Sequence, residues 1–517
     1  MTPTPAGRDG RDVRVVVVGA GFSGLGAAIR LRQAGFGDVL VLEKASQLGG
    51  TWRENTYPGC ACDVPSTLYS YSFTKDTAWS RMFAGQQEIH AYLTATAKSY
   101  GLADVLRYGV GVHAARWDPA AGRWQLETSD GPYSAAVLVM ATGPWHIPRQ
   151  LEVPGLEGFD GPVLHTARWD ERVDLAGKRV SVVGSGASAV QVLPAITGRA
   201  ASVHLFQRTA QWVLPKPDLP LPPAFNLAVN RLPGARRGLR AFQYALQESF
   251  GYAFRHPKLA RLLEAGARAH LRLAVPDRRL RRALTPDYRL GCKRLLTSST
   301  YYPALNQPHV HLHPTAVSSV RGNTIVGADG TTAETDVLIT ATGFRVGELP
   351  LARHLHGAAG RTLHETWGGE PQAYLGTTVT GFPNLFLLLG PNLLGGATSA
   401  ITILEAQLTH LVTALTHLDQ NSHQALEVRP CVQAAHNSAV QRALATTVYN
   451  TGGCTSYYLA PSGRNTFAWP WSTGRLTRRL HHFDPAAYTR HTQPSALPTP
   501  RLPQDDNLPA PAPRRNS

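Results

Sequence analysis

Three glycines near the start of the chain, Gly19, Gly21 and Gly24, stand between an apolar strand and a helix-like segment. Glycines at this spacing permit a tight turn and let the backbone approach a pyrophosphate at the N-terminus of the helix. Glu43 ends the next apolar strand, where a carboxylate accepts hydrogen bonds from the hydroxyls of an adenosine ribose. The strand, turn, helix and acid together predict a dinucleotide-binding βαβ unit, to which Phe22 and Ser23 of the turn belong.

A second glycine-rich turn, Gly184-Ser185-Gly186-Ala187-Ser188-Ala189, follows the apolar residues 180–183. Alanine is an accepted variant in the third glycine position. After the next strand, Arg208 stands where a unit that reads a ribose 2′-hydroxyl would carry a carboxylate. A guanidinium pairs bidentately with a 2′-phosphate, which a carboxylate would repel. This unit is therefore predicted to prefer NADPH to NADH, with a purely surface role for Arg208 as the alternative.

Two small-residue turns support a pairing of domains. Ala141-Thr142-Gly143 and Ala341-Thr342-Gly343 each follow an apolar strand, where a small turn lets the chain pass close to a cofactor. Gly49-Gly50-Thr51-Trp52 adds a second glycine pair after Glu43. That arrangement resembles flavoproteins with two dinucleotide sites, in which FAD occupies the N-terminal site. The alternative is a glycine turn beside a packed tryptophan.

The elements that must position these residues alternate between strand and helix, which favours a parallel α/β architecture. Strands are expected at residues 13–18, 39–42, 137–140, 180–183, 203–206, 337–340 and 385–389. Residues 219–290 have helical apolar spacing with arginines on the other faces, which predicts a helical insertion. We interpret it as a basic cover over a cleft, with a membrane-surface helix as the alternative. Residues 1–11 and 492–517 lack apolar periodicity and predict a flexible leader and a disordered Pro-rich tail.

The chain has 517 residues, a length typical of two to four domains at roughly 150 residues each. Its net charge of +16 is not accompanied by a nucleic-acid motif, and a positive field would steer pyrophosphate cofactors, so no nucleic-acid partner is expected. No apolar run approaches the ~18 residues of a membrane span, and the N-terminus lacks a secretory apolar region. A cytoplasmic enzyme without a membrane partner is therefore the expectation.

The five cysteines are Cys60, Cys62, Cys292, Cys431 and Cys454. The close pair Cys60 and Cys62 indicates metal or redox chemistry only weakly, because no second close pair completes a zinc site. We expect reduced, partly buried thiols and no metal site.

The segment Phe159-Asp160-Gly161-Pro162-Val163-Leu164-His165-Thr166-Ala167-Arg168-Trp169-Asp170 matches F-x-G-x-x-x-H-x-x-x-W-[PD], the fingerprint of the Baeyer–Villiger monooxygenases. It lies between the two glycine-rich units, as in that family, and the resemblance covers roughly residues 13–480. The loops around Thr51, Arg208 and Arg294 are similar to the family's flavin-side loop, NADP loop and active-site arginine segment. Two departures are Ser299-Thr300, where the family often has Asn-Asp, and Tyr457, where it has a tryptophan that meets NADP.

The resemblance implies two Rossmann-like dinucleotide-binding domains with a helical insertion at 219–290. The FAD domain would comprise residues 12–145 and 381–491, and the NADP domain residues 146–218 and 291–380. The implied reaction inserts one oxygen atom of O₂ next to the carbonyl of a small-molecule ketone and gives an ester or lactone. NADPH reduces FAD, and a C4a-peroxyflavin attacks the ketone.

The resemblance also assigns site residues. Arg294 would stabilise the anionic peroxide and adduct, a task that suits a planar and permanently charged group, and Asp63 would orient it. Lys293 would reach the 2′-phosphate with Arg208 and Thr209, whereas His165 is not expected to be a general base. Further FAD or NADP contacts are expected at Gly19, Gly21, Phe22, Ser23, Gly24, Glu43, Thr51, Trp52, Arg53, Glu54, Asp63, Tyr69, Val112, Gly143, Gly184, Ser185, Gly186, Ala187, Ser188, Ala189 and Tyr457.

Three other functions compete with this interpretation. A flavin monooxygenase that oxidises amines or sulfides needs the same cofactors, but Trp169-Asp170 and Arg294 argue against it. A disulfide reductase of the same fold needs a redox pair spaced C-x₄-C or C-x-x-C, and neither spacing occurs. A non-enzymatic cofactor-binding or nucleic-acid-binding protein would leave two intact dinucleotide units unexplained.

Overall fold

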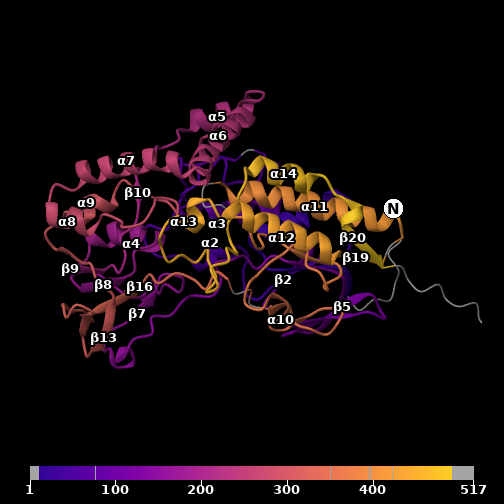
Figure 1. Cartoon of the computed structure of the whole chain (residues 1–517), viewed down its shortest axis with the longest axis horizontal. Helices are drawn as coiled ribbons and strands as arrows, with labels where there is room; N and C mark the ends of the chain where they lie inside the picture. The colour runs from indigo at the N-terminus through magenta and orange to yellow at the C-terminus, as the bar shows by residue number, and fades with distance from the viewer. Residues whose placement is uncertain are drawn as a thin grey trace, which may run out of the picture.

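The structure is a computed structural model that describes residues 11–491, apart from residues 76, 348, 350, 395–397 and 423. Two largely parallel sheets lie toward opposite ends of the long axis, and helices from separate parts of the chain cover them (Figure 1). The expected tail and all but residue 11 of the expected leader lie outside the described residues. Within the described part of the chain, no helix combines the length and apolarity needed to cross a membrane.

The first sheet has eight strands and contains the N-terminal glycine-rich unit. Its order is β17-β4-β5-β6-β1-β2-β3, with β18 pairing to β6. Strands β6, β1, β2 and β3 run parallel, and β4, β5 and β6 form an antiparallel meander. The strands are β1 (Asp12–Val18), β2 (Val39–Glu43), β3 (Leu106–Tyr108), β4 (Val112–Asp118), β5 (Arg123–Thr128), β6 (Gly131–Met140), β17 (Leu355–His356) and β18 (Leu385–Leu387).

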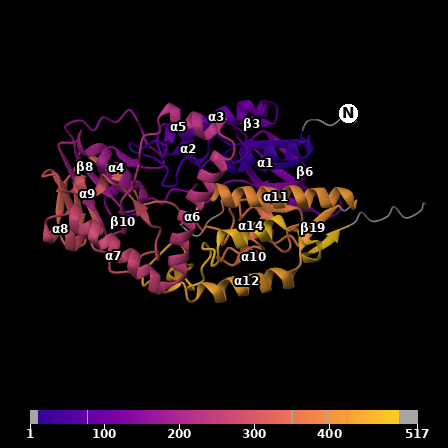
Figure 2. The ribbon, with the colours of Figure 1, turned by 90° about the horizontal axis from the view of Figure 1, so that it is seen from above.

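Strand β1 is buried on both faces, which explains why its sequence is continuously apolar rather than alternating. Val15 joins the core beneath α1 (Phe22–Gln33) and α11 (Ala400–Gln420). Val16 points the other way, into a core that contains Trp124 of the meander. Figure 2 shows α11 lying between α1 and α14, with which it packs.

The chain returns to the first sheet earlier than the sequence suggested. Strand β17 pairs with β4, and α10 (Leu363–Trp367) packs into the same core as Trp124, although the predicted NADP segment extends to residue 380. A two-residue strand is too short to show an apolar period, so the sequence gives no signal for it. The domain limits themselves stay a prediction.

The second sheet is entirely parallel and holds the second glycine-rich unit. Its order is β12-β9-β8-β16-β7, and its faces are covered by α4 and α9 on one side and by a small antiparallel sheet on the other. The strands are β7 (Val163–His165), β8 (Arg179–Val183), β9 (Ser202–Phe206), β12 (Val310–His313) and β16 (Val337–Thr340), the helices are α4 (Ala187–Thr197) and α9 (Tyr301–Leu305), and the small sheet consists of β13 (Val317–Arg321), β14 (Thr324–Gly327) and β15 (Thr332–Glu334). All seven strands expected from the sequence are present; β16 has the predicted ends, and the ends of the other six are shifted.

The helical insertion is also present. It contains α5 (Pro223–Arg231), α6 (Ala235–Arg255), α7 (Pro257–Ala274) and α8 (Arg278–Ala283). In Figure 1, α5 and the adjoining part of α6 project from the body, while α7 runs along the second sheet's helices. The remaining elements are α2 (Thr51–Glu54), α3 (Gln86–Ser99), α12 (Pro430–Leu444), α13 (Val448–Thr451), α14 (Thr473–His481), β10 (Val213–Leu214), β11 (Leu296–Thr297), β19 (Ala425–Val428), β20 (Tyr488–His491) and the short 3₁₀ turns η1 (Leu102–Asp104), η2 (Leu156–Gly158) and η3 (Pro485–Ala487).

Gln407 on α11 fixes the chain where it leaves β18. Its side chain is fully buried, and its amide nitrogen donates to Leu387 O and Thr377 Oγ1, both at 2.9 Å. Its oxygen accepts from Leu389 N at 2.8 Å. A buried amide whose donors and acceptor are all paired holds one backbone geometry, because each lost bond would leave a buried polar group unpaired.

Replacing Gln407 should destabilise the fold. We expect Gln407→Leu to lower the free energy of unfolding by about 2–4 kcal/mol, because Leu389 N and Leu387 O lose buried partners. Gln420→Leu, at the exposed end of the same helix, is the matched control and should change it by less than ~0.5 kcal/mol. Urea unfolding followed by circular dichroism measures the free energy of unfolding of both variants. Equal losses would contradict the structural role of the Gln407 hydrogen bonds.

Candidate active site

The first glycine-rich turn is closed so tightly that side chains do not fit. Gly19 has φ +105°, and a Cβ added to Gly24 would lie 1.8 Å from Gly19 O. Gly50 lies across the turn, where an added Cβ would come within 3.1 Å of Gly21 Cα. No side chain caps the N-terminus of α1 among the described residues, so its first amides face this narrow glycine cradle. The cradle fits a pyrophosphate held by backbone amides.

Glu43 supports the turn itself. Its buried carboxylate accepts from Ala20 N at 2.8 Å and Ala45 N at 3.0 Å, and Arg53 Nη1 lies 3.2 Å from it. Arg53 also donates to Glu54 Oε1 at 2.8 Å. The acid that the sequence assigned to the ribose therefore also fixes the glycine turn, a contact that the spacing of the motif does not reveal.

Aromatic side chains form one wall beside this turn. Trp52 of α2 donates from Nε1 to Tyr69 OH at 3.2 Å, and the ring of Tyr69 meets that of Phe22 edge to face at 5.2 Å. Ser23 is buried at the start of α1, whereas Thr51 at the start of α2 is exposed. The structure thus brings these predicted residues together on one side of the cradle.

A cavity of about 670 Å³, including its open mouth, lies where β6 and β18 end. Gly143, with φ +68° and open space around it, lines the cavity opposite Leu389 and Gly390. Tyr457 and Phe467 close another side, with their rings edge to face at 5.2 Å. Val112, predicted as a cofactor contact, begins β4 and is not among the lining residues.

The second glycine-rich turn has the same construction. Gly184 has φ +129°, and an added Cβ would lie 2.4 Å from Ala341 O, so the second Ala-Thr-Gly segment packs directly on it. Gly186 faces open space and precedes α4, which no side chain caps among the described residues. Ser185 donates to Thr209 O at 2.8 Å and so ties the turn to the segment that carries Arg208. In the first turn of α4, Ala187 and Ser188 are partly exposed and Ala189 is buried.

Arg208 and Lys293 lie near each other although both are cations. Burial, and then the positive charge of Arg208, lower the pKa of Lys293 below its usual value. Lys293 Nζ packs over the ring of Tyr288 at 4.9 Å, and neither cation forms a salt bridge within the described residues. Each positive charge destabilises the charged form of the other, and a bound anion would relieve this repulsion. The two cations therefore fit a phosphate group.

Arg294 and Asp63 form the central ion pair of the site, although 231 positions separate them in the sequence. Arg294 Nη2 lies 2.7 Å from Asp63 Oδ1, and Nε lies 3.0 Å from Oδ2, a bidentate geometry. The side chains are 28% and 23% exposed, so the pair is neither sealed nor at the open surface. The Asp63 carboxylate raises the pKa of Arg294 still further above its usual value, and the guanidinium stays charged.

Aromatic rings connect this ion pair to the cavity. The Arg294 guanidinium lies 6.0 Å from the centre of the Trp145 ring, and that ring lies 6.4 Å from Phe467, which lines the cavity. The sequence analysis did not single out Trp145, although its place two residues after the first Ala-Thr-Gly turn is a signal that could have found it.

Lys216 is a second residue that the sequence analysis did not single out. Its Nζ donates to Cys62 O at 3.0 Å and lies 4.9 Å from the centre of the Phe83 ring. Burial lowers the pKa of Lys216, and the charges of Asp218 and, less strongly, Asp63 partly offset that shift. Lys216 therefore anchors the backbone beside Asp63 from the segment that follows Arg208.

His165 of the fingerprint holds backbone geometry. Its Nδ1 accepts from Ala167 N at 3.0 Å, so the proton of the neutral ring is on Nε2, which lies 3.3 Å from Thr342 Oγ1. Burial lowers the pKa of His165, which favours this neutral form at pH 7. The fingerprint also supplies β7, an edge strand of the second sheet, and so does more than link the two units.

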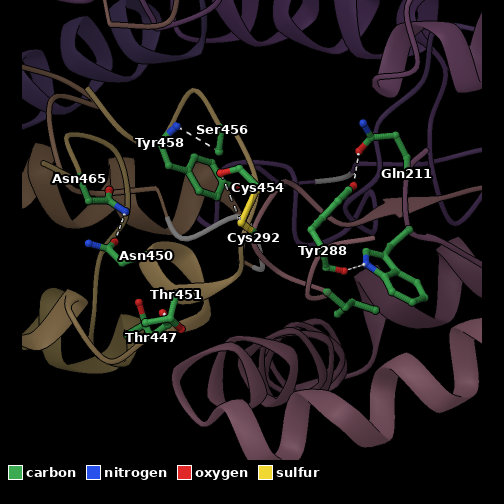
Figure 3. Close-up of a disulfide and its surroundings, with 12 residues drawn as sticks. Gln211, Tyr288, Cys292, Thr447, Asn450, Thr451, Cys454, Ser456, Tyr458 and Asn465 are labelled. Atoms are coloured by element: carbon green, nitrogen blue, oxygen red, sulfur yellow. Dashed lines mark hydrogen bonds between the residues drawn. A yellow bond between two sulfur atoms is a disulfide. The ribbon is translucent and has the colours of Figure 1, made fainter. Parts of the chain in front are cut away.

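The expectation for the cysteines is wrong in two respects. Cys292 and Cys454 form a disulfide, with Cα atoms 6.1 Å apart, and Cys431 is exposed (Figure 3). Cys60 and Cys62 are free thiols, partly buried and buried respectively. The bonded pair is 162 positions apart, and sequence spacing does not report a proximity that only the tertiary fold creates.

Known proteins resemble the chain over most of its length. A family model described as pyridine nucleotide-disulphide oxidoreductase matches residues 16–232. The chain is 46% identical over 478 residues to a Baeyer–Villiger monooxygenase of Streptomyces coelicolor, with 92% of each chain covered. It is 40% identical to one of Pseudomonas aeruginosa, with 98% and 97% covered. A solved oxidized steroid monooxygenase bound to NADP is 29% identical, with a TM-score of 0.82, 93% of this chain and 99% of that chain covered.

Two glycine-rich units on separate sheets, together with the matching family model, define an oxidoreductase with two dinucleotide-binding folds. Within that class the relatives decide: the chain belongs to the Baeyer–Villiger monooxygenase family. The family and the fold class predicted from the sequence are confirmed, and the disulfide-reductase and non-enzyme alternatives are set aside.

The half-buried ion pair should contribute measurably to stability. We expect Asp63→Asn to lower the free energy of unfolding by about 1–3 kcal/mol, because a partly desolvated guanidinium loses its charged acceptor. Asp104→Asn is the matched control, since Asp104 pairs with Arg32 at 2.7 Å but is 64% exposed, and its effect should stay below ~1 kcal/mol. Urea unfolding compares the two variants, and a smaller effect at Asp63 would contradict the assigned burial.

Proposed function

We propose that the protein is an NADPH- and FAD-dependent monooxygenase that converts a small-molecule ketone and O₂ into an ester or lactone. The observation that carries the proposal is the bidentate ion pair of Arg294 and Asp63, joined by aromatic rings to the cavity. We place FAD at the first glycine cradle and NADPH at the second, where Arg208 and Lys293 supply cations for the 2′-phosphate. When bound, the two cofactors supply the hydride and the reduced ring that activates O₂.

The protein's own contribution is a fixed positive charge where negative charge develops on the oxygen-bearing groups. Asp63 engages Nε and Nη2 of Arg294, and no acceptor among the described residues occupies Nη1. The carboxylate thus holds the guanidinium plane while Nη1 stays available to the reacting oxygen. A cation already held in place needs no reorganisation during the reaction, which is the basis of electrostatic catalysis.

The cavity supports a ketone of mainly apolar character. Its walls include Leu389, Phe467 and the ring of Tyr457, which is 41% exposed. Apolar walls exclude water from a reactive oxygen species and bind hydrocarbon groups. We further propose that Tyr457 contacts the nicotinamide and that the enzyme is cytoplasmic, where NADPH is regenerated, with no nucleic-acid or membrane partner.

Arg208 should select NADPH over NADH. We expect Arg208→Ala to raise the KM for NADPH roughly ten- to a hundredfold and leave the KM for NADH nearly unchanged, because one charge-assisted phosphate contact is lost. Arg199→Ala is the control, since Arg199 is an exposed cation of the same sheet region that pairs with Asp174 at 2.8 Å. Steady-state NADPH and NADH oxidation measures both variants, and equal KM changes for the two nucleotides would contradict the role of Arg208.

Arg294 should be required for oxygen insertion but not for flavin reduction. We expect Arg294→Ala to keep FAD and its reduction by NADPH while ester formation falls about 10²–10³-fold, since hydride transfer needs no cation at the oxygen site. Arg294→Lys keeps the charge but loses the planar two-point contact with Asp63, so it should recover little.

Stopped-flow flavin reduction, run beside product analysis with ketone and sulfide panels, separates these steps. Ester formation by Arg294→Ala at the wild-type rate would refute the assigned role. Sulfoxide without ester from the wild-type enzyme would favour the alternative of heteroatom oxygenation.

A further inference from the structure

The Cys292–Cys454 disulfide joins the two chain segments that carry the outer groups of the site. Arg294 follows Cys292 by two residues, and Tyr457 follows Cys454 by three. Figure 3 shows the bond between the strand of chain that leaves Tyr288 and the turn that leads to Ser456 and Tyr458. The covalent link therefore spans the catalytic ion pair on one side and the cavity wall on the other.

The Cys292 side of the link is held firmly by other contacts. Leu290 N donates to the buried Glu264 of α7 at 3.1 Å, and Arg289 Nε lies 2.5 Å from the same carboxylate. Arg289 N also donates to Gly452 O at 2.9 Å, a contact that joins this segment to the start of the Cys454 turn. This segment would keep its place without the disulfide.

The Cys454 side is held mainly at the two ends of its turn. Tyr458 is buried and stacks on Phe467 with ring centres 5.1 Å apart, which fixes the far end of the turn. Gly453 has φ +76°, and the backbone contacts of the turn gather at its far end, where Thr466 N donates to Tyr458 O at 3.0 Å, Tyr458 N to Ser456 Oγ at 3.2 Å and Leu459 N to Ser456 O at 3.2 Å. The disulfide is thus the one covalent tie of the turn that carries Tyr457 in the described part of the chain, and it adds to the packing of the Tyr457 ring against Phe467.

The distances are short enough for this tie to matter to catalysis. Two extended residues span at most ~7 Å and three span at most ~11 Å, so the backbones of Arg294 and Tyr457 lie no farther than this from the bonded cysteines. Tyr457 also lies close enough to Arg294 for its hydroxyl to affect the pKa of the guanidinium. Displacing a reacting or shielding group by about 1 Å can lower a rate by about 10²-fold.

We propose that the disulfide between Cys292 and Cys454 is a positioning element that holds Tyr457 over the Arg294 site, and that a dithiol reductant uncouples NADPH oxidation from oxygen insertion by opening it. The inference rests on the proposed function and extends it to the redox state of the protein. In the step, the S–S bond breaks, two electrons and two protons pass from the dithiol to Cys292 and Cys454, and the dithiol becomes a disulfide.

The opened turn changes oxygen insertion more than flavin reduction. Arg294 keeps its charge through Asp63, and the Glu264 contacts keep the Cys292 segment in place. The freed Tyr457 turn lets water into the cavity, where hydration of the developing anion weakens its interaction with the fixed cation. The reduced enzyme therefore oxidises NADPH but releases more hydrogen peroxide and less ester.

A thiol map tests whether the bond exists in the active holoenzyme. The FAD-loaded protein is alkylated with iodoacetamide in denaturant, before and after reduction with dithiothreitol, and digested for mass spectrometry. We expect Cys60, Cys62 and Cys431 to be alkylated in both samples and Cys292 and Cys454 only after reduction. Alkylation of Cys292 and Cys454 without reduction, in protein that makes ester, would overturn the proposal.

A functional comparison tests what the bond does. We expect Cys454→Ser, normalised to bound FAD and assayed well below its unfolding temperature, to lose coupling of ester to NADPH by about tenfold. Its rate of flavin reduction should change less than twofold, and its Kd for NADP⁺ should rise because Tyr457 is no longer held. Wild-type enzyme treated with dithiothreitol should behave as Cys454→Ser does, and removal of the reductant in air should restore coupling.

Controls separate this role from general stabilisation and from failure of the proposed function. Cys431→Ser, at an exposed free thiol on α12, should match the wild type and keep its response to dithiothreitol, whereas Cys454→Ser should lose that response. The oxidised wild-type enzyme is the reference for the coupling of ester formation to NADPH oxidation. If either Cys454→Ser or the reduced wild type makes ester with the same coupling, the positioning role is refuted. If the wild type makes no ester from any ketone, the proposed function fails, while the thiol map still decides the disulfide.

Discussion

The ion pair between Arg294 and Asp63 is the contact on which the site depends, because it joins two segments that lie 231 positions apart in the sequence. Asp63 lies in the loop after the flavin-side helix α2, and Arg294 follows the helical insertion. Lys216 anchors the backbone beside Asp63, and Glu264 of α7 anchors the segment before Arg294. The helical insertion thus helps to place the guanidinium, in addition to covering the surface.

The positive charge of the chain is concentrated in the helical insertion. Residues 223–283 contain 13 lysines and arginines but only 3 acids, so the insertion carries much of the net charge of +16. Burial, and then the charge of Arg208, lower the pKa of Lys293, and neither cation forms a salt bridge in the described part of the chain. A general positive field attracts anionic cofactors from a distance, whereas a close cation pair fixes one phosphate group in place.

Some residues of the sequence motifs hold backbone geometry and take no part in the chemistry. His165 is neutral and hydrogen-bonded to the backbone and to Thr342, so it shapes the turn next to the second glycine motif. Glu43 similarly holds the first glycine turn through Ala20 and Ala45. Groups of this kind set the backbone geometry that cofactor sites require, even though they need not take part in the reaction.

The sequence by itself determined the two glycine turns, the central strands and the family. These features are local: a glycine with positive φ or a two-sided apolar strand leaves a signal within a few residues, as at Gly184 and in β16, whose ends match the prediction. The pairing of Arg294 with Asp63 was expected from the resemblance rather than from spacing. Helices of the insertion were also predicted, because apolar residues recur there at helical intervals.

Only the tertiary structure decided the contacts between distant segments. The Cys292–Cys454 bond, the Trp145 ring beside Arg294 and the hydrogen bond from Lys216 to Cys62 O each join residues more than 140 positions apart, and no local pattern encodes such distances. Strand β17 was missed because two residues cannot display a period, and pairing with β4 alone defines it. Local backbone conformation is determined by neighbouring residues, whereas contacts between distant segments depend on how the two sheets and the insertion pack together.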